Sequence, residues 1–560
     1  MLIAAIALLA TSAAADFTLT LLSTHDVRGS AFPVSEFGSE CRHDYYADKP
    51  CKCYGGAARR AGVLAAATHP DVVSLDSGDH FFGGGSFFPA FGGVASAELF
   101  AACGYEAYGL RYRDFSAFAN SSSDGAAALS AILDRMRAHD PTLPLPVVSN
   151  LDVSGVPSLE SRIARSSVVP LGGGRTLGVI TLFDQTDLKA TNPTMAARCH
   201  DWRRGLTTAL ADLRAAGMPT VVVVVVQAAH AVTLDGSAPG KEGESISETI
   251  RRAVLQLAAE EVEVDVFLAM GSHFARQELT EVDDWAGGRT LIATQPVSTP
   301  LWSNFASKRR GEYVLNLTVS FDDNGVLVPN ASVREVIHLD CNAAEDATVK
   351  ARLAELHAEM TETLSLVVGE LKGDAGADRA SPPPEDETAG PVKILPGGCA
   401  NLPAGVGCGC YVADCQAGML IADALQHVAD AEMAFVNGGG VRAGFLNGPV
   451  TKLDLGQALP FFNELIRVTV SGAAVKAALE WGLSNLAQDD AIGDTANGRF
   501  LQVSSSVSVK WFLNKKKEFG VEVSDVKIDG AALVSIQPYT VALGSFRRAA
   551  RGAGRASAGR

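Results

Sequence analysis

Phe435-Val-Asn437-Gly-Gly-Gly-Val-Arg442 is the stretch from which the organisation of this chain is best approached. An apolar run leads into Asn437, and the three glycines after it let the backbone turn and come close to a ligand. Arg442 follows with a planar fork of donors that suits phosphate or carboxylate. Because most glycine-rich turns are only turns, this stretch alone indicates a ligand site weakly.

Two neighbouring segments add to this signal. Asp414-Cys-Gln-Ala-Gly418 is a turn that opens a helix, and Leu459-Pro-Phe461-Phe462-Asn463 is a turn that can expose an aromatic ring. The three pieces, in this order, resemble the C-terminal domain of the 5′-nucleotidase family. A later segment, which begins at Tyr539 and ends at Phe546, resembles the last signature of the same domain.

The resemblance implies a nucleotide site in this part of the chain. In the family, an asparagine and an arginine hold the nucleotide, and two phenylalanines enclose its base. The residues that would form the site here are Asn437, Gly439, Arg442, Phe461 and Phe546. Single aromatic residues usually belong to a core, so the stacking role of the two phenylalanines depends on their motifs.

The composition is that of a globular protein with more than one domain. With 560 residues, of which 47% are hydrophobic and 20% charged, the chain can bury a sizeable core. The formal net charge of −16 argues against nucleic acid as a partner. A nucleoside monophosphate or a nucleoside is the partner that we expect, because a local arginine pocket can lie within an acidic protein. The sequence gives no oligomeric state.

Targeting signals indicate a secreted or extracellular protein. Residues 1–15 are apolar and end in small residues, which predicts a signal peptide rather than a buried strand. Ten cysteines and the sequons at Asn120, Asn316 and Asn330 fit the secretory pathway, and the cysteines predict disulfides whose pairing stays open. No run predicts a transmembrane segment. The basic residues 547–560 indicate a disordered tail or an altered terminus, and not a lipid-anchor signal.

From residue 17 to about residue 340 the sequence alternates apolar runs with helical stretches. The run 221–226 consists of six valines, and continuous β-branched runs suit strands that are buried on both faces. Further strands are expected at 17–22, 72–75, 147–149 and 264–269, and helices at 126–138 and 205–216. This alternation predicts a layered α/β domain.

Polar residues follow several of these strands, at the edge where the chemistry of such sheets usually lies. Asp26 lies in Thr24-His-Asp26-Val-Arg28-Gly, and Asp79 ends Asp76-Ser-Gly-Asp79. Each residue alone is more simply a loop or cap residue. Together the segments resemble the N-terminal metallophosphoesterase domain of the same family, which implies two divalent metal ions such as zinc. The metal ligands would be Asp26, Asp79 and His273, with His230 as a further candidate if its loop shifts.

The predicted metal site departs from the family pattern. Residues that do not bind metals stand at positions where the family has ligands or catalytic groups: Arg28, Tyr112, Arg113, Ala228 and Gly271. A guanidinium about 4 Å from a divalent ion costs on the order of 8 kcal/mol at an effective dielectric near 20, and arginine cannot lose its proton. We therefore expect the two ions not to bind normally. No catalytic residue is assigned, because the family's histidine position is Arg113.

Two arrangements are open for the arginines. Arg28 and Arg113 either pair with the two aspartates, which gives a metal-free site that tolerates phosphate, or turn outward to solvent. His80 and Asp114 remain candidates for ligands of a single, weaker metal ion.

An amphipathic helix is expected to join the two domains. Residues 344–371 carry apolar side chains at three-four spacing, and residues 372–396 are rich in Gly, Pro and acid, as in an exposed linker. The predicted fold class is a layered metallophosphoesterase-like α/β sandwich, joined by this helix to a smaller α/β 5′-nucleotidase C-terminal domain. The expected divisions are a signal peptide at 1–15, the metallophosphoesterase-like domain at 16–340, the helix and linker at 341–400, the nucleotide-binding domain at 401–546 and the tail at 547–560.

The function implied by the resemblance is hydrolysis of nucleoside 5′-monophosphates to nucleoside and phosphate, a step of nucleotide catabolism. Because the metal positions are altered, we expect this member to be impaired or inactive. The alternative is a secreted pseudoenzyme that binds nucleotide or phosphate without hydrolysis, and a third interpretation is a structural or interaction protein. Tyr411 stands where the family has a second arginine, and the acid expected on the ribose is absent, so nucleotide binding should be weak.

Overall fold

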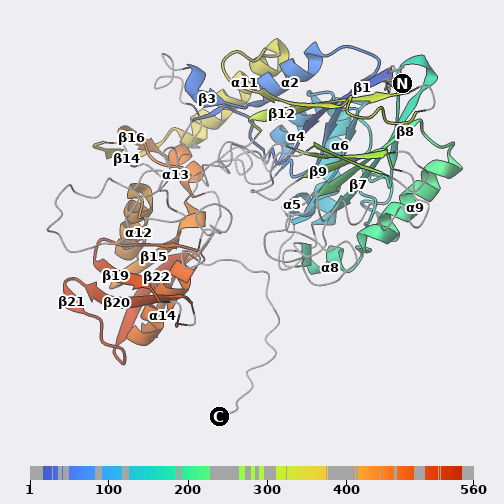
Figure 1. Ribbon diagram of the computed structural model, residues 1–560. Helices are drawn as coiled ribbons and strands as arrows, with labels where there is room; N and C mark the ends of the chain where they lie inside the picture. Colours follow the sequence, from blue (N-terminus) through green and yellow to red (C-terminus); the bar gives the residue numbers. More distant parts are fainter. Residues whose placement is uncertain are drawn as a thin grey trace, which may run out of the picture.

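We describe the protein from a computed structural model, shown in Figure 1. The residues that it describes are 17–27, 29–35, 41, 50–81, 91, 93–116, 125–183, 188–189, 192–227, 264–270, 279–283, 289–295, 311–322, 325–373, 375, 410, 414–441, 443–459, 463–484, 499–514, 516–517 and 519–544. The predicted signal peptide, most of the linker and the basic tail lie outside these residues.

Two mixed sheets form the first part of the chain. The five-stranded sheet has the order β13-β12-β1-β4-β5, and the six-stranded sheet has the order β10-β11-β9-β8-β7-β6. The strands of the first are β1 (Phe17–Thr24), β4 (Val72–Asp76), β5 (Ala107–Tyr108), β12 (Tyr313–Phe321) and β13 (Val333–His338). The strands of the second are β6 (Ser167–Pro170), β7 (Thr176–Phe183), β8 (Val221–Gln227), β9 (Val266–Met270), β10 (Leu279–Asp283) and β11 (Arg289–Thr294). A small ribbon, β2 (Val34–Ser35) with β3 (Cys53–Tyr54), lies outside both sheets.

The valine run in β8 explains the layers. Successive side chains of a strand point to opposite faces of the sheet. The odd-numbered valines of 221–226 belong to the core between the two sheets, together with Leu19 and Leu21 of β1. The even-numbered valines pack on the other face, against leucines of α9 (Trp202–Ala215). A continuous apolar run is therefore required, because both faces of this strand are buried.

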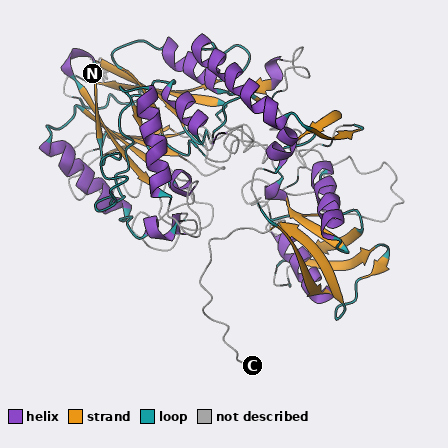
Figure 2. Ribbon diagram, turned by 180° about the vertical axis from the view of Figure 1, so that it is seen from behind, coloured by secondary structure: helices purple, strands orange, loops and turns teal. Residues whose placement is uncertain are grey.

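Helices cover the outer faces of the two sheets, as Figure 2 shows from behind. The core outside the first sheet is formed with α2 (Ala57–Ala66), α4 (Val94–Ala101), α6 (Ala126–His139) and α11 (Ala347–Leu364). Short helices are α5 (Tyr112–Ser116), α8 (Pro193–Ala196), η1 (Pro50–Lys52) and η2 (Gly172–Gly174). The order helix, sheet, sheet, helix confirms the predicted layered α/β sandwich.

The second part of the chain is a smaller α/β unit. A four-stranded sheet has the order β17-β22-β15-β18, and a three-stranded sheet has the order β19-β20-β21. Its helices and strands are α12 (Gln416–Ala429), β15 (Met433–Asn437), η5 (Gly438–Gly440), α13 (Lys452–Ala458), β17 (Leu465–Ser471), α14 (Gly472–Leu483), β18 (Leu501–Val503), β19 (Val507–Leu513), β20 (Val521–Ile528), β21 (Ala531–Ala532) and β22 (Pro538–Gly544). Side chains of β15 alternate between a core with α14 and a core with α12, so this sheet is also covered on both faces.

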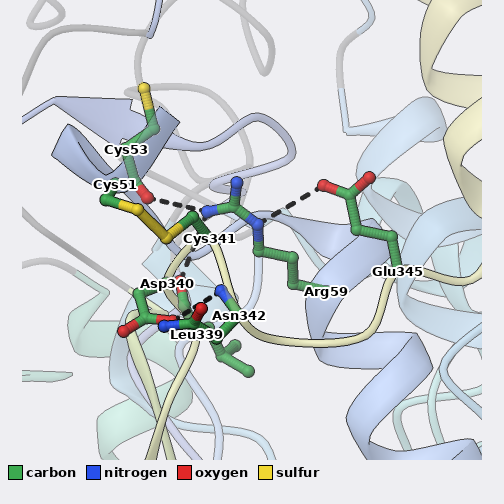
Figure 3. Close-up of a disulfide and its surroundings, with 8 residues drawn as sticks. All are labelled: Cys51, Cys53, Arg59, Leu339, Asp340, Cys341, Asn342 and Glu345. Atoms are coloured by element: carbon green, nitrogen blue, oxygen red, sulfur yellow. Dashed lines mark hydrogen bonds and ion pairs between the residues drawn. A yellow bond between two sulfur atoms is a disulfide. The ribbon is translucent and has the colours of Figure 1, made fainter. Parts of the chain in front are cut away.

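Three disulfides are formed among the described residues, and they supply the pairing that the sequence left open. Cys41 bonds to Cys53, Cys51 bonds to Cys341, and Cys410 bonds to Cys415. Figure 3 shows the Cys51–Cys341 bond beside Arg59, whose Nη1 donates to the Cys53 carbonyl at 2.7 Å. The bond therefore fastens the segment before α2 to the segment before α11.

Two expected elements differ in the structure. In place of a strand at 147–149, only Val147 forms isolated bridges, and the prolines at 144 and 146 supply no donor to a ladder. The expected helix at 344–371 ends at Leu364, and its last part becomes β14 (Val367–Leu371), which pairs with β16 (Gly448–Thr451). The domain boundaries stay predictions.

Candidate functional site

The ends of β1 and β4 bring two predicted residues to one edge of the first sheet. These strands are parallel neighbours, so Asp26 and Asp79 follow strand ends that point the same way. Both residues have a left-handed backbone, with φ of 55° and 62°. The amide of Asp26 donates to the Gly78 carbonyl at 3.0 Å, which ties the two loops together. Aspartate tolerates this conformation better than most residues do.

Asp79 is held by two arginines. Its side chain is fully buried, and its Oδ2 lies 3.0 Å from Arg111 Nη1 and 3.5 Å from Arg113 Nε. Burial raises the pKa of the Asp79 carboxyl, while the two guanidinium groups act in the opposite direction. Its Oδ1 has no hydrogen-bond partner in the described part of the chain. Asp79 is therefore the counter-ion of an arginine pair in this structure.

The two arginines are kept in place by the tyrosine between them. The Cζ atoms of Arg111 and Arg113 lie 5.3 Å and 5.2 Å from the centroid of the Tyr112 ring. Arg113 Nε also donates to the Tyr112 hydroxyl at 2.7 Å. Burial opposes the positive charge of both guanidinium groups, but Tyr112 and the carboxylates of Asp79 and Asp26 raise their pKa above the usual value. Both charges are therefore permanent.

Asp114, which the sequence offered as a weak metal ligand, bonds to backbone amides instead. Its Oδ2 accepts from the amides of Asp79 at 2.8 Å and Arg111 at 2.9 Å, and its Oδ1 accepts from the amide of His80 at 2.7 Å. Asp114 thus fixes the loop after β4 to the start of α5. Both of its oxygens are used in this structural task.

His80, the other candidate for a weak metal, is placed as an imidazolium. Its Nε2 lies 2.8 Å from the Gly109 carbonyl, which can only accept, and its Nδ1 lies 3.0 Å from Asp76 Oδ1. Burial opposes the charge, but Asp76 and Asp114 outweigh it and raise the pKa of His80 to about 9. In this arrangement both ring nitrogens of His80 face oxygen atoms of the protein.

The described residues do not supply the ligand set that two divalent ions need. No group of three or more His, Cys, Asp or Glu side chains in the described ranges is arranged to hold a metal ion. The remaining positions in question lie outside those ranges, namely Arg28, Ala228, His230, Gly271 and His273. The metal-ligand assignments of Asp26, Asp79 and His273 therefore stay predictions.

Arg111 is the site residue that sequence reasoning missed. It lies at the start of the segment Arg111-Tyr112-Arg113-Asp114, in which Tyr112 and Arg113 are the residues that stand at ligand or catalytic positions of the family. Its guanidinium is buried and makes the shorter contact with Asp79. The available signal was an arginine next to a buried strand end, where a buried anion is needed as its partner.

The second candidate site is the turn after β15. Asn437 precedes η5 without a capping hydrogen bond from its side chain, and the Gly438 amide donates to the Phe500 carbonyl at 2.7 Å. A Cβ on Gly440 would lie 3.0 Å from Asn437 Oδ1, so the asparagine side chain folds back over the glycine turn. Asn437 and Gly439 are described, whereas Arg442, Phe461 and Phe546 lie outside the described residues.

The ends of the two phenylalanine motifs are close together. A Cβ on Gly544 would lie 3.3 Å from Cβ of Asn463. Gly544 also pairs with Leu465 in the β17–β22 ladder. Asn463 and Gly544, each two positions from a predicted stacking residue, therefore meet at one end of the four-stranded sheet.

Comparison with known proteins agrees with this architecture. A sequence model of the 5′-nucleotidase C-terminal domain matches residues 397–558, which include the Asn437 turn. The chain is similar to 5′-nucleotidases, through this domain model in its C-terminal part and through related sequences over most of its length. A 5′-nucleotidase of Mus musculus is 23% identical over 521 residues, which cover 90% of this chain and 77% of the relative.

Other proteins to which the chain is similar come from bacteria and snakes. The trifunctional nucleotide phosphoesterase protein of Bacillus subtilis is 25% identical over 508 residues, and the match covers 88% of this chain but only 30% of that relative. The snake venom 5′-nucleotidase of Gloydius brevicauda is 24% identical, with 90% and 75% covered. The crystal structure of a 5′-nucleotidase precursor from Thermus thermophilus shares the fold, with a TM-score of 0.61, 24% identity and coverage of 94% and 89%.

Proposed function

We propose that this protein binds nucleoside 5′-monophosphates or nucleosides as a member of the 5′-nucleotidase family in which metal-dependent phosphomonoester hydrolysis is impaired. The observation that carries the proposal is the pairing of Asp79 with Arg111 and Arg113. A carboxylate that would bridge two cations is here neutralised by side chains of the protein. Two permanent guanidinium charges beside it oppose a divalent ion, since like charges at such distances repel strongly.

The C-terminal turn supports the nucleotide part of the proposal. Asn437 and Gly439 lie at the carboxyl end of β15, and the family match covers this region. Together with Arg442 and the two phenylalanines, they would hold the phosphate and the base. Base stacking contributes about 1–3 kcal/mol per aromatic ring in comparable sites. Because the second arginine and the ribose acid are absent, we expect weak binding of adenosine or AMP.

A second candidate function is residual metal-dependent hydrolysis of nucleoside monophosphates. It is favoured by Asp26 and Asp79, whose carboxylates follow adjacent strand ends, and by Asp79 Oδ1, which is buried without a partner among the described residues. If His230 and His273 complete the shell, the metals would activate water and neutralise the phosphate.

One experiment separates the two candidates. The purified protein is loaded with Zn²⁺ or Mn²⁺, desalted and analysed for bound metal, and phosphate release from AMP is measured beside a snake venom 5′-nucleotidase as positive control. We expect clearly less than two ions per chain and little phosphate release. Two tightly bound ions with release at the rate of the control would establish the second candidate instead.

Nucleotide binding has a separate test. Titration with adenosine or AMP should show weak binding that Phe461→Ala reduces by about tenfold, because a stacking ring is lost. Phe512→Ala in β19, which removes an exposed ring of the same unit, is the control and should bind as the parent does. Absence of binding, or equal binding by both variants, would remove the nucleotide pocket and leave a structural role.

We also propose secretion. Three disulfides among the described residues fit an oxidising compartment. The described helices include none that is long and apolar enough to cross a membrane.

A further inference from the structure

We propose that the arginine centre at Asp79 binds a phosphate monoester or inorganic phosphate directly through Arg113, without a metal ion. This inference rests on the proposed function, because it concerns the site at which hydrolysis is impaired. The proposed function does not say which positive group contacts the phosphate. Here that group is the guanidinium of Arg113, which takes the place of a metal ion.

Arg111 and Arg113 have different tasks at this centre. The Arg111 side chain is 7% exposed and makes a 3.0 Å contact with Asp79, so its charge is used inside the protein. The Arg113 side chain is 26% exposed and lies farther from Asp79, at 3.5 Å. Arg111 therefore neutralises the carboxylate, and Arg113 is the guanidinium that an external anion can reach.

The bonding of Arg113 leaves a suitable edge for an oxyanion. Its Nε donates to the Tyr112 hydroxyl and faces Asp79. Its Nη1 and Nη2 donate to no acceptor within the described residues. Two parallel N–H groups of a guanidinium match two oxygens of a phosphate, which gives a bidentate contact of defined direction.

The surroundings hold this guanidinium ready for binding. The Tyr112 ring lies about equally far from both arginines, and Asp114 fixes the backbone on either side of the site through four amides, those of Asp79, His80, Phe81 and Arg111. Pre-organisation of this kind lowers the entropy that is lost when a ligand binds. A guanidinium does not lower the pKa of a bound water molecule as a metal ion does, so a phosphate ester held by Arg113 alone would be retained rather than cleaved.

The test is titration of the full-length protein with inorganic phosphate in the presence of EDTA, followed by calorimetry or phosphorus NMR. Inorganic phosphate is the probe because it lacks a base and does not depend on the aromatic pocket. We expect saturable binding with the same affinity in EDTA and in added Mg²⁺. Arg113→Gln should weaken it about tenfold or more, and Arg113→Lys should weaken it less, because a charge remains without the fork.

Two control variants keep the result interpretable. Arg162→Gln removes an arginine that pairs with Asp134 on the surface, and it should leave phosphate binding unchanged. Arg442→Gln removes the arginine predicted for the other site, and phosphate binding should persist in it. Circular dichroism of each variant shows whether it is folded. If Arg113→Gln does not fold, the test uses Arg113→Lys.

Each other outcome overturns the inference. It fails if phosphate does not bind in EDTA, if Arg113→Gln binds like the parent, or if Arg442→Gln alone abolishes binding. These results would leave the proposed function intact, provided that AMP binds and hydrolysis is low. Two bound metal ions with AMP hydrolysis would overturn both proposals.

Discussion

At the scale of single residues, the environment decides which chemistry a side chain can perform. Asp79, Asp114 and His80 are all types that bind metals, and all follow β4 or open α5. In the structure Asp79 pairs with arginines, and Asp114 accepts hydrogen bonds from backbone amides. His80 donates a hydrogen bond to a backbone carbonyl. Each of these partners uses the lone pair or the negative charge that a metal would need. A suitable residue type at a suitable position is therefore insufficient evidence for a metal site.

His80 should make stability depend on pH. Its pKa is about 9 in the folded protein and near 6.5 when unfolded, so folding favours its protonated form. The resulting stabilisation, about 3 kcal/mol, is fully present below pH 6.5 and is lost as pH rises through 9. Denaturation by urea at several pH values should show His80→Gln losing the most stability, relative to the parent, below pH 6.5.

The groups that face His80 explain this direction. Asp76 and Asp114 provide the negative charge, and the rings of Phe81, Phe100 and Tyr108 enclose the imidazole. His139→Gln, at the exposed end of α6, is the control and should follow the parent at every pH. A constant difference between His80→Gln and the parent from pH 6 to 10 would contradict the prediction.

At the scale of helices and strands, the sequence predicted those elements whose own residues determine them. The valine run predicted β8, and the three-four spacing predicted α11 as far as Leu364. It failed at Val367–Leu371, because β14 depends on β16, a partner about eighty residues later. Similarly, the role of Arg111 depends on a contact with Asp79 across the sheet edge, which no local pattern records. Local periodicity predicts helices and strands such as α11 and β8. Features such as β14 and the role of Arg111 depend on contacts with residues far away in the sequence.

Gly418 in α12 should be sensitive to a single methyl group. A Cβ at this position would lie 2.5 Å from Cγ of Gln502, whose amide bridges the Cys415 amide and the Cys410 carbonyl. Gly418→Ala should therefore lower the free energy of unfolding by about 1–3 kcal/mol, because the buried bridge must move. The measurement is chemical denaturation.

The matched control is Gly369→Ala in β14. A Cβ there meets no atom within 4 Å, and no left-handed φ requires glycine. It should leave stability unchanged or raise it by at most about 1 kcal/mol. Similar losses in the two variants would show that the Gln502 bridge is not the cause.

At the scale of the whole molecule, the Cys51–Cys341 disulfide should be the bond on which stability depends most. It joins residues separated by 290 positions, whereas Cys410–Cys415 spans 5. Loop-closure entropy grows with the logarithm of loop length, so the difference amounts to about 3–4 kcal/mol. Replacing Cys51 and Cys341 by alanine should lower the melting temperature far more than replacing Cys410 and Cys415. Equal losses would mean that native contacts, and not chain entropy, set the cost.

The same disulfide determines how the protein would respond to mechanical force. A pull on the two ends of the chain would pass through the Cys51–Cys341 bond, and the stretch between these cysteines, which are 290 positions apart, would carry no load. The extension of the fully stretched chain would be shorter by roughly 1,000 Å than without the bond. β1 lies outside the closed loop although it is a central strand of its sheet. It would therefore bear the load directly, and its removal would leave a covalently closed sandwich without its middle strand.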